Sequence, residues 1–419
     1  MVAPVVVTGA AWTTPLGRGL DAVWRRLLAG EHGFVEVPSP HRLRNTQAAV
    51  VPRRSGGLAE ARSGGVAAKD APASRALPTL EVEPERARSL SLERAADSQE
   101  PAGPAERLRS LAVETLREAL AHADLAGDGT RTLFVLGTSL GAYLDDEGER
   151  NAPLHQWADA VVGTLGAKAP PVVLSTACSS GSDALVVGAE CIRAGLADVC
   201  VCGGVDILTP SKRLAHSALS TLSPSRARAY DTRHDGMMLG EGAAFLVLES
   251  AAHAEQRSAR ILARLRGVGS ANDAASMTSP DPAAAGARLA MERSLADAGL
   301  AASEIGLVNG HGSATPVNDR AEAAAFRSVF GSEGGPLVFA TKGAFGHTLG
   351  ATGAMEAIAT ILGLREGIVP PIVGLEQPDP DFPCPLSVGA PTRHAARKGL
   401  SVTLGFGGFD TSLVFEVAR

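Results

Sequence analysis

The stretch Val172-Val-Leu-Ser-Thr-Ala-Cys-Ser-Ser-Gly-Ser-Asp-Ala-Leu185 places a cysteine between a predicted strand and a predicted helix. The β-branched start is typical of a buried strand, and residues 185–192 carry apolar side chains at the spacing of one helix face, ending at Gly195. Cys178 therefore lies at a predicted helix N-terminus, where unpaired N–H groups and the helix dipole favour the reactive thiolate. The alternative is an inert thiol in the core.

Two histidines in glycine-rich turns favour the reactive interpretation. His311 lies in Val308-Asn-Gly-His-Gly-Ser-Ala-Thr-Pro316, and His347 lies in Thr341-Lys-Gly-Ala-Phe-Gly-His-Thr-Leu-Gly-Ala-Thr-Gly353. Glycines beside a polar side chain let substrate or main chain approach closely. The remaining histidines are interpreted as surface residues or satisfied core residues: His32, His41, His122, His155, His216, His234, His253 and His394.

An internal repeat predicts that these turns meet in one site. A shift of 172 residues places 133–138 on 305–310. The same shift matches four residues around Cys178 with identical types around His347: Thr176 with Thr348, Gly181 with Gly353, Arg193 with Arg365, and Gly195 with Gly367. Two copies of one α/β half, related by a pseudo-two-fold axis, would bring the two turns together and place His311 after a strand equivalent to 133–136. Chance similarity between two α/β units is the alternative.

Several short motifs extend through almost the whole chain. They are Val5-Val-Val-Thr-Gly9, Thr14-Pro-Leu-Gly17, Thr176-Ala-Cys-Ser-Ser180, Tyr230-Asp-Thr-Arg-His-Asp-Gly236 with Gly240-Glu-Gly242, Met277-Thr-Ser-Pro280, the His311 turn, 342–353, and Gly405-Phe-Gly-Gly408. In this order they resemble the β-ketoacyl-acyl-carrier-protein synthases (ketosynthases), type II. The resemblance implies an α/β, thiolase-like fold with two pseudo-symmetric halves in a layered αβαβα core. Residues 1–250 would carry the nucleophile and 251–419 the two histidines.

The resemblance also implies a decarboxylative Claisen condensation. Cys178 would take an acyl group from one carrier and present it to the carbanion of a malonyl thioester. His311 and His347 would donate N–H groups to the thioester oxygen on which charge collects when carbon dioxide leaves. The backbone N–H groups of Cys178 and Phe406 would form the oxyanion hole for acyl transfer. Phe406, followed by Gly407, would be the aromatic gate between the two steps.

Five further residues have expected supporting roles. Lys342 would hold a carboxylate or a histidine in place, with a solvated turn lysine as the alternative. Glu322, with Asp319 before it, would pair with Lys342 and keep the net charge of the site low. Ser313 and Thr315 would contact the phosphopantetheine arm of a carrier protein. No residue is assigned to a metal, and no cofactor is expected on the chain itself.

Three departures from the family pattern limit the inference. Asp410 stands where most relatives carry an amide residue, so it brings an unexpected carboxylate near the Cys178 pocket. Ala314 replaces a usual glycine, which would be costly if the backbone there needs a positive φ. The interval between the 137–141 turn and Cys178 is short against elongating relatives, so the acyl chain length stays open.

Length, charge and cysteine content narrow the classes of protein to which this chain can belong. The chain has 419 residues, a net charge of −6 with scattered signs, and five cysteines without disulfide-like spacing. These features give no argument for nucleic-acid binding and favour a reducing cytoplasm. The sequence shows no basic-then-apolar leader and no run of membrane-spanning length.

One segment, from about 38 to 105, differs from the rest. It is rich in Pro, Arg, Ser, Gly and Ala, and it lacks periodic apolar residues except for a short helical pattern at 86–95. An irregular insertion is expected. The alternative is that its arginines help to dock an acidic carrier protein. Helical periodicity resumes at Leu108.

The sequence therefore predicts a free-standing type II ketosynthase that recognises an acyl carrier protein in trans, as a homodimer or as a heterodimer with a related subunit. Fatty acid, polyketide and polyene pathways stay open. The alternatives are an acyltransferase that works without decarboxylation and a non-elongating subunit of a heterodimer. A thiolase using coenzyme A thioesters is disfavoured, because the turn Gly405-Phe-Gly-Gly-Phe-Asp410 lacks the second cysteine that such enzymes need.

Overall fold

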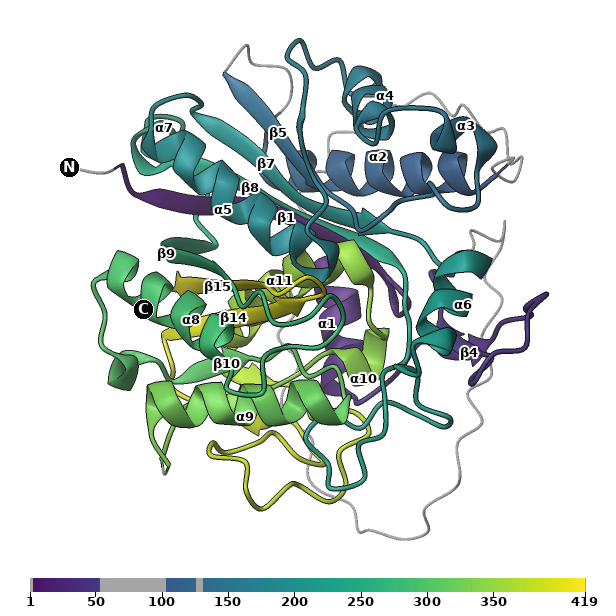
Figure 1. Cartoon of the computed structure of the whole chain (residues 1–419). Helices are drawn as coiled ribbons and strands as arrows, with labels where there is room; N and C mark the ends of the chain where they lie inside the picture. Colours follow the sequence, from purple (N-terminus) through teal and green to yellow (C-terminus); the bar gives the residue numbers. More distant parts are fainter. Residues whose placement is uncertain (1–2, 53–102, 126–130, 333, 419) are drawn as a thin grey trace, which may run out of the picture. The chain divides into compact units, whose positions relative to one another are not determined.

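Ten strands follow one another in a mixed sheet whose order repeats in two halves (Figure 1). The computed structural model describes residues 3–52, 103–125, 131–332 and 334–418. The first half runs β6 (Val172–Leu174), β5 (Thr132–Gly137), β7 (Val199–Asp206), β8 (Gly242–Ser250) and β1 (Val5–Thr14). The second runs β11 (Leu337–Phe339), β10 (Leu307–Asn309), β14 (Lys398–Gly405), β15 (Phe409–Glu416) and β9 (Ala263–Asn272).

The pairing directions repeat as well. In each half the second strand pairs in parallel with both of its neighbours, and the last three strands pair antiparallel. The two halves meet where β1 and β9 pair antiparallel, through Val5, Val6 and Val7 of β1 alone. The predicted two-half architecture is confirmed by this strand order.

Two helices repeat at the predicted offset. The short 3-10 turns η1 (Ala177–Ser179) and η3 (Leu349–Ala351) precede α5 (Ser180–Arg193) and α11 (Thr352–Glu366), and both turns and helix starts are 172 residues apart. The first residue of each turn has the same left-handed φ of 51°. The repeat predicted from the sequence is therefore a structural repeat.

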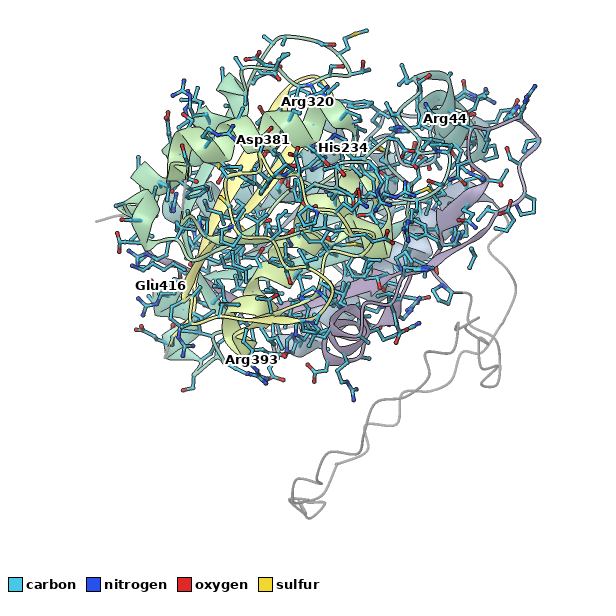
Figure 2. The ribbon with its side chains drawn as sticks, turned by 90° about the horizontal axis from the view of Figure 1, so that it is seen from below. Arg44, His234, Arg320, Asp381, Arg393 and Glu416 are labelled. Carbon is cyan, nitrogen blue, oxygen red and sulfur yellow. The ribbon has the colours of Figure 1, made fainter. Side chains whose placement is uncertain are left out.

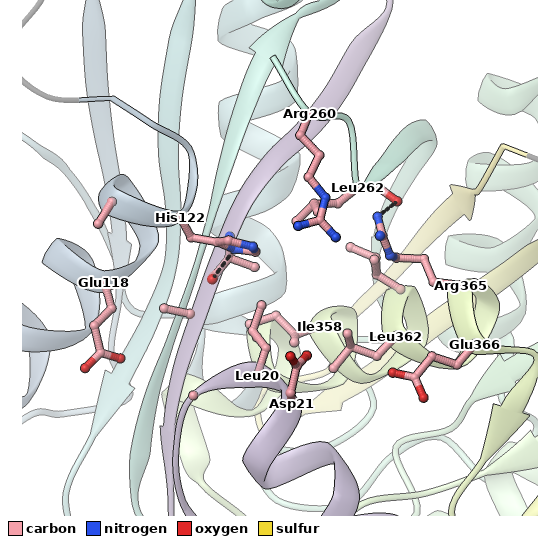
Figure 3. A pocket seen from close by; sticks show the side chains of 15 residues that line it. Leu20, Asp21, Glu118, His122, Arg260, Leu262, Ile358, Leu362, Arg365 and Glu366 are labelled. Carbon is pink, nitrogen blue, oxygen red and sulfur yellow. Dashed lines mark hydrogen bonds between the residues drawn. The ribbon is translucent and has the colours of Figure 1, made fainter. Parts of the chain in front are cut away.

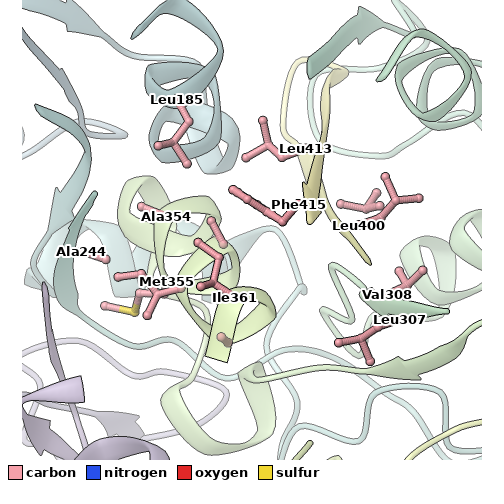
Figure 4. Packing of buried hydrophobic residues seen from close by; sticks show 14 of the residues in the cluster. Leu185, Ala244, Leu307, Val308, Ala354, Met355, Ile361, Leu400, Leu413 and Phe415 are labelled. Atoms are coloured by element: carbon pink, nitrogen blue, oxygen red, sulfur yellow. The ribbon is translucent and has the colours of Figure 1, made fainter. Parts of the chain in front are cut away.

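These two helices form the middle layer. The side of Gly181 in α5 faces α11 so closely that a Cβ there would lie 2.9 Å from the oxygen of Gly350. Figure 4 shows Leu185 of α5 and Ala354, Met355 and Ile361 of α11 packed beside Leu413 and Phe415 of β15. All residues of α11 as far as Leu364 are buried. Such a helix is expected to be apolar all round, and its buried part is apolar except for Glu356 and two threonines, Thr352 and Thr360.

Two outer helix layers cover the remaining faces. The helices α2 (Pro104–His122) and α4 (Gln156–Thr164) bury apolar side chains against β5, β7 and β8. The helices α8 (Ala285–Ala298) and α9 (Pro316–Phe330) lie on the opposite side, where α8 packs on β9 and β15 (Figure 1). The order of layers is αβαβα, as predicted.

Shorter elements complete the described residues. They are β2 (Gly17–Arg18), α1 (Leu20–Leu28), β3 (Phe34–Glu36), β4 (Gln47–Ala49), α3 (Glu147–Arg150), α6 (Pro210–Ala218), α7 (Ala251–Gln256), η2 (Ala302–Glu304), α10 (Lys342–Phe345), β12 (Ile368–Val369) and β13 (Thr392–Arg393). Charged side chains of both signs, such as Arg393 and Glu416, lie at the periphery (Figure 2). Within the described ranges, no helix has the length and apolarity that a bilayer crossing requires.

Two expectations about domains are not decided by the fold. The irregular segment predicted at 38–105 and its helical pattern at 86–95 lie largely or wholly outside the described residues. The predicted division at residue 250 falls at the end of β8, yet contacts group the described residues into one unit. Separate domains 1–250 and 251–419 therefore stay a prediction.

Candidate active site

Cys178 lies in the predicted strand-turn-helix, inside η1 and directly before α5. Its side chain is buried and lines a cavity of about 210 Å³. His311, His347 and Phe406 line the same cavity. The structure thus brings together the cysteine and the two histidines that the sequence placed in separate turns.

Burial has the largest effect on the pKa of the Cys178 thiol. It raises the pKa of Cys178 to about 11, while the N–H of Phe406, which hydrogen-bonds the sulfur, and the Lys342 ammonium lower it. The expectation that the helix N-terminus favours a thiolate is wrong for the free enzyme, because desolvation of the charged sulfur outweighs the local stabilisation. At neutral pH the Cys178 side chain is therefore a thiol, so any reaction in which its sulfur forms a bond has to remove the thiol proton.

The two imidazoles lie edge to face with ring centroids 5.2 Å apart. Nδ1 of His347 accepts the N–H of Leu349 at 3.1 Å, and Nδ1 of His311 lies 3.2 Å from the Lys342 ammonium. A ring nitrogen that accepts a hydrogen bond carries no proton, so both rings keep theirs on Nε2. Burial, followed by Lys342, lowers the pKa of both histidines well below the usual range. The cavity therefore contains two neutral N–H donors.

Lys342 links His311 to a buried carboxylate that the sequence analysis missed. Its ammonium donates to the carbonyl oxygen of His311 and to the carboxylate of Glu356 in α11. The expected ion pair with Glu322 is therefore wrong. Glu356 reaches Lys342 through tertiary packing, and Thr403 also donates to it at 3.2 Å. The signal that was available is a carboxylate in the middle of a mostly apolar helix, since such a group needs a buried partner.

Glu322 and Asp319 instead hold the His311 turn from α9. Glu322 accepts the N–H groups of His311 and Gly312, both at 2.7 Å, and Asp319 accepts the N–H of Ala314 at 3.1 Å. Ala314 has a φ of 67°, so the position does require the left-handed region, at a cost of about 1–2 kcal/mol for a residue with a Cβ. Burial and Asp319 raise the pKa of Glu322 to about 7.

The turn between β14 and β15 brings Phe406 to the cysteine. Gly407 and Gly408 have φ of 81° and 75°, so two consecutive residues lie in the region that favours glycine. Asn272 donates to the oxygen of Gly407 at 2.8 Å and fixes the turn from β9. The turn therefore holds the N–H of Phe406 at the sulfur of Cys178.

His216 is a second site residue that the sequence analysis missed. It was interpreted as an ordinary histidine, but its ring packs on Phe406 with centroids 5.7 Å apart. Burial, followed by Lys212, lowers its pKa to about 4, and it contributes to the low pKa of His347. From the sequence, helical periodicity predicts only that His216 is a polar residue of a helix. No local motif predicts its tertiary contact with the Phe406 turn.

The mouth of the cavity carries hydroxyl groups. Ser313 Oγ and Thr315 Oγ1 lie 3.0 Å apart and line the cavity. The motif residues Thr278, Ser279 and Pro280 line it as well. These side chains offer hydrogen bonds to a polar, extended group entering toward Cys178.

Asp410, the unexpected carboxylate, is only 2% exposed. Burial and the neighbouring Asp273 raise its pKa to about 8. Asp410 directly follows the turn that carries Phe406. Ionisation of its buried carboxyl would therefore destabilise the folded chain at this turn.

Replacing Asp410 by asparagine should stabilise the protein at alkaline pH. The carboxyl has a pKa near 8 in the folded chain and near 4 when unfolded, so the native state binds the extra proton and loses stability as pH rises from about 4 to 8. Asp410→Asn removes this loss, worth on the order of a few kcal/mol above pH 8. Urea unfolding from pH 5 to 9 should show a flatter profile for the variant. Parallel profiles would contradict a buried, protonated Asp410.

Removing the charge of Glu356 should destabilise the protein more than any surface change. Glu356→Gln leaves the Lys342 ammonium buried without its carboxylate, and breaking a buried pair in this way costs about 3–5 kcal/mol. Urea unfolding at pH 7 measures the loss. Glu366→Gln, at the exposed end of the same helix, is the matched control and should change stability by less than about 0.5 kcal/mol. Equal effects of the two variants would contradict the proposed importance of the pair.

Cysteine chemistry elsewhere adds no second site of this kind. All five cysteines are free thiols. In the parts of the chain that the structure describes, no cluster of three or more His, Cys, Asp or Glu side chains is arranged to hold a metal ion.

Comparisons with known proteins agree with this geometry. The family described as "Beta-ketoacyl synthase, N-terminal domain" matches residues 2–254, and "Beta-ketoacyl synthase, C-terminal domain" matches 262–376. The chain is 32% identical over 434 residues to 3-oxoacyl-acyl-carrier-protein synthase 2 of Vibrio harveyi, covering 98% of both proteins. It is 34% identical over 333 residues to nodulation protein E of Rhizobium meliloti, covering 74% of this chain and 82% of that protein.

Solved structures show the same fold. A β-ketoacyl synthase from Burkholderia phymatum has a TM-score of 0.81 at 28% identity, with all of both chains covered. The ishigamide ketosynthase/chain length factor has a TM-score of 0.82 at 24% identity, again over all of both chains, which is evidence for the fold. Fold, motifs and matched residues together show that this chain belongs to the β-ketoacyl synthase family.

Proposed function

We propose that this ketosynthase condenses a Cys178-bound acyl group with a malonyl unit, with loss of carbon dioxide. The observation that carries the proposal is the shared cavity: a buried thiol, the N–H of Phe406 at its sulfur, and two neutral imidazoles with protonated Nε2 atoms. Each group matches one charge that develops during the reaction.

Acyl transfer comes first. The sulfur of Cys178 attacks the carbonyl carbon of an acyl thioester, and the N–H groups of Cys178 and Phe406 stabilise the resulting oxyanion. The carrier thiol then leaves with the proton that Cys178 gives up. A buried thiol of high pKa suits this transfer, because the proton lost by Cys178 is taken up by the leaving carrier thiol and none is released to solvent.

Decarboxylation and condensation follow. A malonyl thioester in the cavity loses carbon dioxide, and the electron pair of the broken bond forms an enolate whose oxygen accepts N–H groups from His311 and His347. The enolate carbon attacks the acyl carbonyl on Cys178, and the C–S bond breaks with its electron pair going to the sulfur. The thiolate then takes a proton from water and returns to the thiol. The product is a β-ketoacyl thioester longer by two carbons. Lys342 positions His311 through its hydrogen bonds and is not placed at the reacting atoms.

The proposal includes an acyl carrier protein as the partner that brings both substrates. Relatives are named as acyl-carrier-protein synthases, and one structural neighbour of 22% identity is titled as a complex of a ketosynthase with a type II acyl-carrier protein. The hydroxyls of Ser313 and Thr315 at the mouth suit a phosphopantetheine arm. We further propose a homodimer or a heterodimer with a related subunit, and a cytoplasmic site consistent with five free thiols.

The test is a two-step assay. The purified protein is incubated with a panel of acyl carrier protein thioesters, and acylation of Cys178 is measured by intact mass. Malonyl carrier protein is then added, and product and carbon dioxide are measured. A two-carbon-longer β-keto product with one carbon dioxide per turnover supports the proposal. Acyl transfer to another acceptor without carbon dioxide would establish the acyltransferase alternative, and absence of acylation by every primer would overturn the proposal.

A further inference from the structure

A second cavity, about 630 Å³ in volume, lies where the two halves of the sheet diverge (Figure 3). It shares no lining residue with the cavity of Cys178. β1 pairs with β9 only through Val5–Val7, so the next part of its edge, at Ala10, is open on this side. The ring of His122 closes that edge, with Nδ1 3.1 Å from the nitrogen and 2.9 Å from the oxygen of Ala10. We call this space the junction cavity.

One side of the junction cavity is apolar. Side chains from α1, from the segment before β9 and from the end of α11 form it, namely Leu20, Leu262, Ile358, Ile361 and Leu362. The volume and this lining fall in the range of sites that bind small organic molecules.

The facing side carries cationic groups. Figure 3 shows the guanidinium of Arg260 between the ring of His122 and the side chain of Arg365. Arg365 donates to the backbone oxygen of Leu262 at 3.1 Å, and neither arginine has an ion-pair partner within the described residues. Burial and the charge of Arg260 lower the pKa of Arg365. Arg260 is exposed and Arg365 is half-buried, so an anion between them would gain charge-assisted hydrogen bonds without breaking an existing ion pair.

The carboxylates of the lining limit which anion fits. Glu118 points away from the guanidinium groups in Figure 3, whereas Asp21 lies across from them near Leu20. The charges of Glu366 and Asp21 both raise the pKa of Arg365 and so offset part of the effect of burial and of Arg260. Asp21 therefore disfavours a ligand with several negative charges, such as a pyrophosphate. A ligand with one negative charge and an apolar chain fits this lining, since the charge can contact the guanidinium groups and the chain can contact the apolar side.

We propose that the junction cavity binds a medium-chain fatty acid, with its carboxylate between Arg260 and Arg365 and its alkyl chain against Leu20 and Leu362. This site is separate from the catalytic one, and the inference does not depend on the proposed function.

The test is calorimetric titration of octanoate into the full chain. A Cys191→Ser chain, which lacks the most exposed of the five thiols, is first treated with octyl maleimide at alkaline pH until peptide mapping shows the adduct on Cys178, so that the catalytic cavity is filled. We expect one octanoate per chain, and octanol, which lacks the charge, should bind at least about tenfold more weakly. Arg260→Ala with Arg365→Ala should weaken octanoate by about tenfold or more. Arg264→Ala, an exposed arginine of β9 outside the cavity, is the matched control and should bind as the parent does.

A third variant tests occupation of the junction cavity without changing its charge. Ala121 is an exposed residue of α2 that lines the cavity, and Ala121→Trp should fill it and abolish octanoate binding at an unchanged melting temperature. The proposal is overturned if the alkylated protein binds no octanoate, if octanol binds equally well, or if the double arginine variant and Ala121→Trp bind octanoate like the parent. Binding of inorganic phosphate with no binding of octanoate would overturn it too.

Discussion

Replacing Cys178 by alanine should abolish acyl-enzyme formation and reduce condensation on the order of 10⁴-fold or more. The reason is that the remaining groups of the cavity stabilise charge but offer no covalent attachment for the acyl group. Intact mass after incubation with acyl carrier protein measures the first effect, and β-ketoacyl product measures the second. Cys384→Ala is the matched control, because Cys384 is also buried and burial raises the pKa of its thiol to about 11 as well.

The pH dependence of Cys178 alkylation is part of the same expectation. Only the thiolate reacts, so below a pKa of about 11 the alkylation rate by iodoacetamide should rise about tenfold per pH unit. A rate that is already level at pH 7 would show a thiolate at rest and would contradict the buried thiol. Acylation of the Cys178→Ala protein on another residue would remove Cys178 as the nucleophile.

Replacing His311 or His347 by alanine should slow malonyl decarboxylation by about 10²–10³-fold each, because each variant removes one N–H donor from the developing enolate. Acylation of Cys178 should persist within about tenfold, since its oxyanion is held by backbone N–H groups. The double variant should lose the reaction almost completely. Carbon dioxide release and intact mass separate the two steps.

The control for this pair is His41→Ala, at an exposed histidine remote in sequence from both turns. It should leave both steps unchanged. If His347→Ala instead stopped acylation while decarboxylation continued, His347 would act as the base for Cys178 and the donor assignment would be wrong. A pH profile of decarboxylation that is flat from pH 6 to 8 is expected, because both imidazoles are already neutral below that range.

Local sequence patterns were sufficient to predict the strand, turns and helix that position Cys178 and His347. The run before Cys178, the helix after it and the glycines around His347 are short-range signals, and they correspond to β6, α5 and the turn leading to α11. The repeat could be predicted because each half has to bury the same kind of strand-turn-helix unit, so its spacing is retained while most residues change.

Contacts between distant segments were not predictable in this way. Lys342 pairs with Glu356 and not with Glu322, because α11 passes through the middle layer and brings Glu356 to the ammonium. His216 contacts Phe406 because α6 lies beside the turn after β14. The high pKa of Cys178 also has a long-range cause, since desolvation sums over every element around the sulfur. The sequence predicts the identity of reactive groups better than their charge.

The repeat also shows why only one of two equivalent positions in the described halves carries a side chain. The counterpart of Cys178, 172 residues later, is Gly350, and a Cβ there would lie 2.4 Å from the nitrogen of Ser139. Its N–H donates to Asp206 at 3.0 Å. The crowding leaves no room for a side chain at the second position, so the two equivalent turns offer different chemistry: one presents a thiol to the cavity, and the other presents only a backbone N–H, which holds Asp206.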